Sequence, residues 1–158
     1  MLIRQATPGD AEAIAALLIR SIREICGPDY DNDETLLAQW CANKTPENMR
    51  RGIENPSNYW IVAIENEMIA GTALMTISGE IHLCYLLPEY LGRGIGKAML
   101  NDLLRNARLL GHRKVTLEST RTARKFYKRN GFIETGATMG MGIIPSFAME
   151  LDLTANYA

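Results

Sequence analysis

The chain has 158 residues, of which 47% are hydrophobic and 22% are charged, a composition typical of a soluble globular protein with one hydrophobic core. Seventeen basic and eighteen acidic residues give a net charge of −1, so no general positive field favours nucleic acid as a partner. No apolar stretch reaches the ~18 residues that a membrane-spanning helix needs, and we therefore expect no membrane partner.

The N-terminus and the cysteines bear on the cellular compartment. Residues 1–5 lack the basic and then apolar layout of a secretory signal. Cys26, Cys41 and Cys84 are odd in number, far apart and set among apolar residues, which favours reduced thiols over a disulfide framework. We expect a cytoplasmic protein, and because the chain has only two histidines, we expect no metal site.

The N-terminal third is predicted to hold a strand followed by two or three helices. Residues 7–10 (Thr-Pro-Gly-Asp) combine a capping hydroxyl, a proline at the first helical position and an acid in the first turn. Apolar residues at helical spacing follow, until Gly27 and Pro28 end the first helix. A polar stretch at residues 29–34 leads to a second helix, and the sequence allows a third, short helix after Thr45.

Three consecutive antiparallel strands are predicted in the middle of the chain. Residues 59–65 and 68–77 are rich in β-branched and aromatic side chains, and the Glu-Asn-Glu between them indicates a hairpin. Ser78 and Gly79 make a second tight turn into a third strand at residues 80–87. These strands form the predicted centre of a sheet.

The C-terminal half begins with the clearest helix of the sequence. Its apolar stripe runs from Ile95 to Leu110, and Gly111 then supplies a helix stop. A strand at residues 114–118, a short helix at residues 121–129 and two strands between residues 132 and 153 are predicted to follow.

The order of these elements, β-α-α-βββ-α-β-α-ββ, indicates the fold class. It predicts an α/β (α+β) domain with a mixed, mostly antiparallel sheet and helices on both faces. No linker, repeat or low-complexity tract divides the chain, so residues 1–158 are predicted to form a single domain.

The most informative segment is residues 85–97, where a strand stops at a proline and a long helix begins amid three glycines. Glycine permits φ > 0 and close approach to a ligand, and the first N–H groups of a helix are unpaired at the positive end of its dipole. These features predict a pyrophosphate cradle with Arg93 and Lys97 at its rim.

The alternative is a simple turn, although three glycines in five residues exceed what a turn needs. The glycine spacing disfavours a Rossmann fingerprint, and the missing Gly-Lys-Ser/Thr excludes a Walker loop.

Two segments resemble motifs of the GCN5-related N-acetyltransferase (GNAT) family. Residues 88–97 (PEYLGRGIGK) are similar to the coenzyme A loop, Gln/Arg-x-x-Gly-x-Gly/Ala, and differ from it at Leu91. Residues 119–132 (STRTARKFYKRNGF) resemble the family's Asn/Ser-x-x-Ala-x-x-Phe-Tyr-x-x-x-Gly-Phe motif. The resemblance runs from about Tyr59 to the end of the chain and implies a GNAT-like fold.

The resemblance also implies the reaction and the donor site. The chain would transfer the acetyl group of acetyl-CoA to a primary amine of a small molecule or peptide, without a metal. The pantetheine arm would pair with the strand near residues 85–87 as an added strand does, and the N–H of Leu86 would face the oxyanion. The residues expected to bind acetyl-CoA are Leu86, Leu87, Gly92, Arg93, Gly94, Ile95, Gly96, Lys97, Thr120 and Lys125.

Two catalytic residues are expected. An alkyl amine with a pKa near ~10.4 is protonated at neutral pH and needs a base. Glu80 matches the general-base glutamate of the family's histone-acetylating branch, although a solvated turn glutamate explains it equally well. His82 shares its strand face and is the second candidate base, with a packed or solvent-facing histidine as the alternative. Tyr127 stands at the family's general-acid position, while its neighbour Phe126 is expected in the core.

The remaining parts of the site are less specific. The short helix at residues 121–129 is densely basic, which fits a solvated face or contact of Lys125 or Arg129 with the 3′-phosphate of the coenzyme. In the family the acceptor lies between the N-terminal helices and the last hairpin, which here implies the acidic residues 29–34 and residues 139–146. The sequence identifies no acceptor and leaves both a monomer and a homodimer open.

Two other functions stay open from the sequence. A regulatory acyl-CoA-binding module without turnover is compatible with Leu91 in place of the family's Gln or Arg. A different nucleotide-binding enzyme could use the same glycine turn for phosphate.

Overall fold

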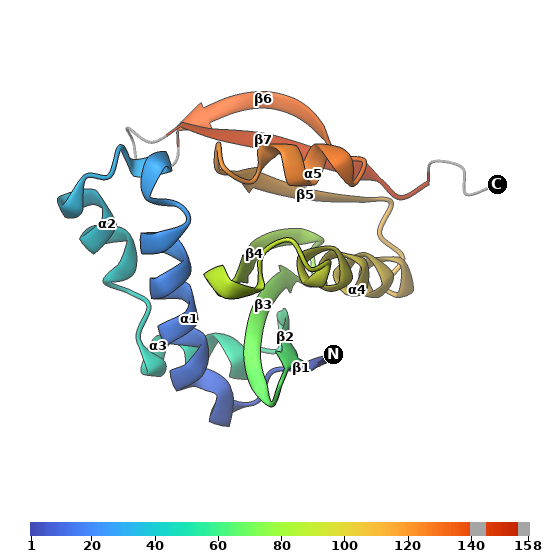
Figure 1. Cartoon of the computed structure of the whole chain (residues 1–158). Coiled ribbons are helices and arrows are strands. Elements are labelled where there is room, and N and C mark those ends of the chain that lie inside the picture. The colour runs from blue at the N-terminus through green and yellow to red at the C-terminus, as the bar shows by residue number, and fades with distance from the viewer. Residues whose placement is uncertain (140–144, 155–158) are drawn as a thin grey trace.

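The computed structural model describes residues 1–139 and 145–154, and within them seven strands form one sheet in the order β1-β2-β3-β4-β5-β7-β6 (Figure 1). Neighbouring strands are antiparallel except for β4 and β5, which are parallel. The predicted mixed, mostly antiparallel sheet is therefore confirmed. The strands are β1 Leu2–Gln5, β2 Asn58–Glu65, β3 Met68–Thr76, β4 Glu80–Leu86, β5 Lys114–Ser119, β6 Ile133–Met139 and β7 Pro145–Asp152.

The helices agree with the predicted order, and the third, short helix before β2 is present. The α-helices are α1 Ala11–Glu24, α2 Glu34–Cys41, α3 Pro46–Glu54, α4 Ile95–Leu109 and α5 Arg124–Arg129, and the 3-10 turns are η1 Pro8–Asp10, η2 Gly27–Tyr30 and η3 Pro88–Tyr90. The helix predicted at residues 121–129 is shorter than expected because residues 121–123 form a turn. None of the described helices has the length and apolar character needed to cross a bilayer.

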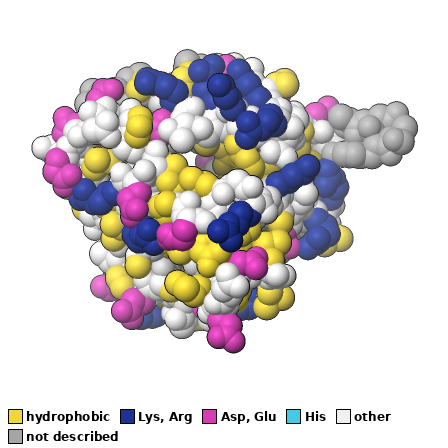
Figure 2. Space-filling view, viewed as in Figure 1, with side chains coloured by type: hydrophobic (Ala, Val, Ile, Leu, Met, Phe, Trp, Pro, Cys, Tyr) yellow, Lys and Arg dark blue, Asp and Glu magenta, His cyan; other side chains and the backbone are white. Residues whose placement is uncertain are grey.

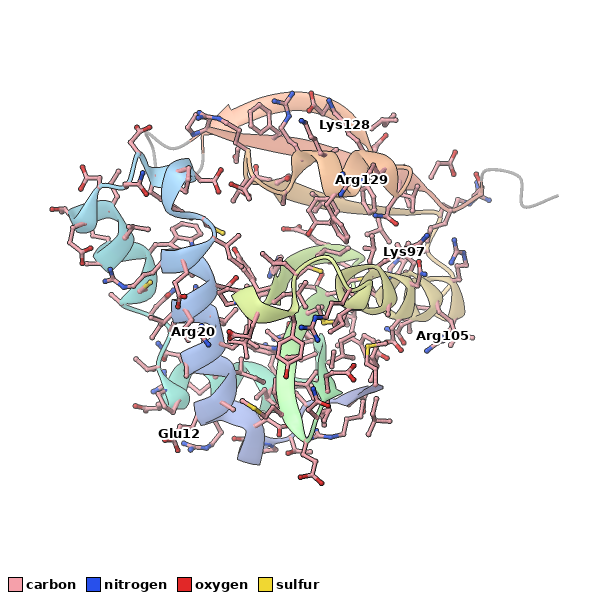
Figure 3. The ribbon with its side chains drawn as sticks, in the orientation of Figure 1. Glu12, Arg20, Lys97, Arg105, Lys128 and Arg129 are labelled. Atoms are coloured by element: carbon pink, nitrogen blue, oxygen red, sulfur yellow. The ribbon has the colours of Figure 1, made fainter. Side chains whose placement is uncertain are left out.

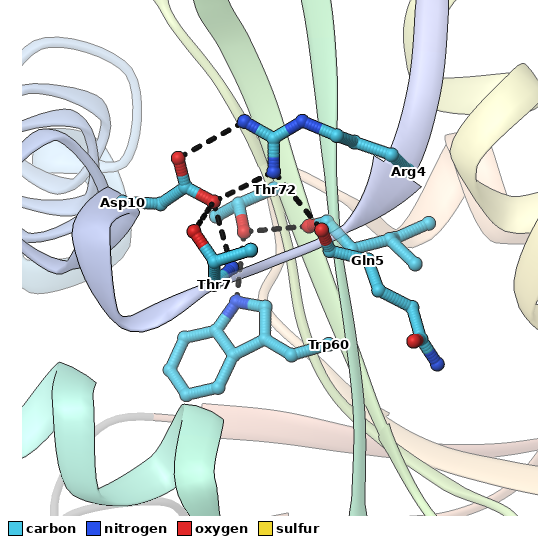
Figure 4. A network of polar contacts seen from close by, with 7 residues as sticks. Arg4, Gln5, Thr7, Asp10, Trp60 and Thr72 are labelled. Atoms are coloured by element: carbon cyan, nitrogen blue, oxygen red, sulfur yellow. Dashed lines mark hydrogen bonds and ion pairs between the residues drawn. The ribbon is translucent and has the colours of Figure 1, made fainter.

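The predicted helix start at residues 7–10 is held by Asp10. Its carboxylate accepts a 2.8 Å hydrogen bond from the Thr7 N–H and two from the Arg4 guanidinium, at 2.8 and 3.1 Å (Figure 4). Because Arg4 lies on β1, this cluster fixes the angle at which the chain leaves the sheet and enters α1.

Helices cover both faces of the sheet. On one face, a Cβ built on Gly71 of β3 would lie 2.8 Å from the end of the Met99 side chain of α4. On the other face, Trp60 of β2 packs so closely on α3 that a Cβ on Gly52 would lie 2.5 Å from its ring. The core therefore lies in two layers, one on each side of β2, β3 and β4.

The sheet opens between β4 and β5, as Figure 1 shows. The two strands pair only where Glu80 and Ile81 meet Thr116 and Leu117. Beyond this point the β5 side of β4 has no partner strand among the described residues. A bulge sits at the point of divergence, since Leu83 and Ile81 pair with consecutive residues of β3 and His82 between them is extra.

Candidate active site

A cavity of about 570 Å³ lies where β4 and β5 diverge. Its walls come from α1, β4, the loop before α4, β5 and α5. Figure 2 shows this face hollowed, with Lys and Arg side chains gathered above the hollow. The size falls within the range of about 300–1,000 Å³ that small-molecule sites occupy.

The glycine turn forms one end of this cavity. Gly92 and Gly94 both line it and have φ values of +74° and +83°, and a Cβ on either would meet no atom within 4 Å. Among the described residues, the N–H groups from Gly92 to Lys97 have no hydrogen-bond acceptor, and Gly94 supplies no side-chain cap to α4. The turn thus presents open space and unpaired donors at a helix N-terminus, an arrangement suited to a phosphate group.

Two cations face this end of the cavity. Lys97 of α4 and Arg129 of α5 both line it, and Figure 3 shows them on facing elements. Arg93 does not line it, and its guanidinium lies over the Tyr90 ring, 5.2 Å from the centroid. Lys125 is exposed and also lies outside the lining.

The basic helix predicted at residues 121–129 is partly neutralised within the fold. Arg124 and Lys128 both form ion pairs with Glu134 of β6. The Arg124 guanidinium also stacks 3.9 Å from the centroid of the Phe147 ring. Arg129 is therefore the member of this helix that both reaches the cavity and has no ion pair among the described residues.

The other residues predicted to bind acetyl-CoA divide into two groups. Leu86, Gly96 and Thr120 line the cavity, whereas Leu87 and Ile95 are buried in the core, with exposed fractions of 7% and 3%. The Leu87 N–H donates to the Ala70 carbonyl of the β3 side at 2.8 Å. Because successive N–H groups of a strand point to opposite edges, the Leu86 N–H points to the open edge of β4.

Tyr127 lies in the cavity wall beside Cys84. Burial is the main cause that raises the pKa of Tyr127 well above its ordinary value of 10.0, and the neighbouring Cys84 and Tyr85 side chains add to the shift. Burial likewise raises the pKa of Cys84 to about 12. The phenol therefore stays protonated near neutral pH. Phe126, expected in the core, is half-buried, packs against the core and also lines the cavity.

Glu80 and His82 form a pair at the bulge of β4. The His82 Nε2 and a Glu80 carboxylate oxygen lie 2.9 Å apart. His82 lines the cavity, whereas Glu80, the first candidate base, lies outside the lining. Their expected position on the same face of the strand is confirmed by this contact.

The acids at residues 29–34 are largely used within the fold. Asp33 caps α2 by accepting from the Thr35 N–H at 2.9 Å, and Glu34 pairs with Arg23 of α1. Asp29 is buried, and its Oδ1 accepts a 2.9 Å hydrogen bond from the N–H of Thr122, a residue of the cavity wall, while its Oδ2 has no partner among the described residues. In the other predicted acceptor wall, residues 140–144 lie outside the described residues.

Sequence reasoning missed part of the site. Side chains of α1 form one wall, and the end of β5 with the following turn forms another. Cys26 was expected only as a reduced thiol among apolar residues, and Ser21 and Thr122 carried no signal of their own. Their position follows from packing of α1 across the opening between β4 and β5, which no local pattern encodes.

Comparison with known proteins places this geometry in a family. Residues 26–153 match the family model described as an acetyltransferase (GNAT) domain. The chain is 24% identical over 131 residues to the uncharacterised N-acetyltransferase YafP of Escherichia coli (strain K12), which covers 82% of this chain and 79% of that protein.

Solved structures share the fold. A GCN5-related N-acetyltransferase from Rhodopseudomonas palustris superposes with a TM-score of 0.87 at 21% identity, covering 96% of this chain and 95% of the other. The PaiA N-acetyltransferase from Thermoplasma acidophilum, solved in complex with coenzyme A, gives a TM-score of 0.77 at 23% identity, covering 96% and 98%. Because the family model matches most of the chain, the chain belongs to the GNAT acetyltransferase family.

Proposed function

We propose that this GNAT protein transfers the acetyl group of acetyl-CoA to a primary amine of a small molecule or peptide. The observation that carries the proposal is the cavity at the divergence of β4 and β5, which ends at the unpaired N–H groups of Gly92 to Lys97. A helix N-terminus with open glycines binds a diphosphate, and an open strand edge binds an extended chain. Coenzyme A contains a diphosphate followed by an extended pantetheine arm, so it can occupy the glycine turn and the strand edge together.

The donor would bind along the whole cavity. Its pyrophosphate accepts hydrogen bonds from the N–H groups of the glycine turn, with Lys97 supplying positive charge, and Arg129 binds the 3′-phosphate. The pantetheine arm pairs with the open edge of β4. This places the thioester near Tyr127 and Cys84, where the Leu86 N–H faces the edge and polarises the thioester carbonyl.

The reaction needs a base and an acid. The neutral amine attacks the carbonyl carbon, so that a C–N bond forms and the C–S bond breaks. His82 takes the proton that the amine loses, directly or through water, and Glu80 holds the imidazole through the 2.9 Å contact. Tyr127 gives its proton to the departing thiolate, for which a phenol kept protonated by burial is suited.

Two measurements on the whole protein test the proposal. Isothermal titration with coenzyme A should show one binding site, and thiol release from acetyl-CoA should depend on an added primary amine. Failure to bind coenzyme A would overturn the proposed donor site. Binding without release across an amine panel would favour the regulatory acyl-CoA-binding module instead.

A further inference from the structure

A second cavity, of about 420 Å³, lies on the α2 and α3 side of the sheet. It shares two lining residues with the first cavity, His82 and Tyr85, both on β4. Both cavities therefore border β4, the strand where the proposed transfer takes place. Because His82 lines both cavities, a molecule whose amine lies at His82 can extend into the second cavity.

The walls of the second cavity are aromatic and amide-rich. Trp40 and Trp60, the only two tryptophans of the chain, both line it, together with three asparagines. Leu74, Leu83 and Met49 contribute apolar surface. Such walls accept an apolar or aromatic body, with amide groups to orient it.

Among the described residues that line this cavity, Lys44 is the only Lys, Arg, Asp or Glu. It is half-buried, its Nζ lies 5.6 Å from the centroid of the Trp40 ring, and it forms no ion pair with the described residues. Burial lowers the pKa of Lys44, which reflects the cost of an ammonium group that has lost water without gaining an anion. A bound anion would offset this cost.

We propose that the acceptor is a primary amine that carries an anionic group, a carboxylate or a phosphate, and that Lys44 binds this group in the second cavity. The proposal rests on the proposed acetyl transfer and specifies its substrate class. No carboxylate lines the cavity among the described residues, so a diamine or a polycationic aminoglycoside finds no partner there for its additional charge.

The test uses amines matched in length that end in a carboxylate, a phosphate, a carboxamide or a second amine. We expect kcat/KM to be at least about tenfold higher for an anionic amine than for its carboxamide, since a charge-assisted hydrogen bond is about twice as strong as a neutral one. The carboxylate and phosphate series show which anion is preferred. Equal rates across the series, or preference for the diamine, would overturn the proposal.

Lys44→Met keeps an unbranched stem and removes the charge. It should abolish the preference, so that kcat/KM for an anionic amine falls to about the value for its carboxamide. Arg50→Met on α3 removes an exposed cation that does not line the cavity and should leave the preference intact. A preference that survives Lys44→Met contradicts the assignment.

Tryptophan fluorescence separates failure of binding from failure of transfer, because both tryptophans line this cavity. Titrating the coenzyme A-saturated protein with an anionic amine should change the emission with a Kd that Lys44→Met raises about tenfold. If no amine is acetylated but this titration succeeds, the proposed transfer fails and the anion site stands. If the amine neither binds nor reacts, the anion site is wrong.

Discussion

At the scale of single residues, the hydroxyl of Tyr127 makes the sharpest prediction. Tyr127→Phe removes the proposed proton donor but keeps the ring contacts with Phe126 and Phe132. We expect kcat to fall about 10²-fold, since general acid catalysis contributes that much or more, with coenzyme A affinity changed by less than about twofold. Because burial raises the Tyr127 pKa above 10.0, loss of activity through its ionisation should begin only above about pH 10.

The matched control is Tyr59→Phe. The Tyr59 hydroxyl donates to Asp102 at 2.7 Å, away from the cavity. This variant should lose about 1 kcal/mol of unfolding free energy and keep its kcat. Unchanged kcat in Tyr127→Phe would remove Tyr127 from the mechanism.

Arg129 and Lys125 offer a second comparison at this scale. Both were candidates for the 3′-phosphate of the coenzyme, and only Arg129 lines the cavity. We expect Arg129→Gln to raise the Kd of coenzyme A about five- to tenfold, or about 1–1.4 kcal/mol, without affecting dephospho-coenzyme A. Lys125→Gln should leave both values unchanged. The opposite outcome in calorimetry would assign the phosphate contact to Lys125.

At the scale of an element, the β2–β3 hairpin carries backbone strain. Asn66 and Glu67 form a two-residue turn with φ values of 51° and 64°, and the second position of such a turn favours glycine. Glu67→Gly should therefore raise the unfolding free energy by about 0.5–1 kcal/mol. Glu67→Ala removes the same side chain but keeps the strain, and in thermal melts it should show no comparable gain.

The start of α1 makes a pH-dependent prediction. The hydrogen bonds from Arg4 hold the pKa of Asp10 below its ordinary value of 3.8, so the carboxylate stabilises the fold above about pH 4 and loses this effect as the pH falls through its lower folded pKa. Asp10→Asn should cost about 1–2 kcal/mol at pH 7, and the difference from wild type should shrink below pH 3.8.

Glu12→Gln is the control for Asp10, because Glu12 is exposed at the same helix start (Figure 3). Urea unfolding at pH 7 and pH 3 should show little change in this variant. A deficit in Asp10→Asn that is as large at pH 3 as at pH 7 would contradict the account.

At the scale of the whole molecule, the sequence predicted what local patterns encode. The helical stripe of α4, the hairpins and the glycine turn each depend on neighbouring residues, and the structure has them near the predicted bounds. The bulge at His82 and the hydrogen bond between Asp29 and Thr122, 93 residues apart, depend on tertiary packing. The second cavity likewise forms only when α2 and α3 cover the sheet, so no local sequence motif predicts that Lys44 lines a cavity.

The central claim is that the N–H groups of Gly92 to Lys97 bind the diphosphate of acetyl-CoA. Gly94 and Gly111 allow a direct measurement, because they lie just outside the two ends of α4 with φ values of +83° and +84° and open space around each Cβ position. Glutamate at either position incurs the same backbone strain, so the two variants should lose similar stability.

Isothermal titration of both variants with coenzyme A decides the matter. We predict that Gly94→Glu raises the Kd at least about 100-fold, because its side chain blocks the turn and repels phosphate, while Gly111→Glu binds as wild type does. Normal affinity in Gly94→Glu, or equal losses in the two variants, would contradict the claim.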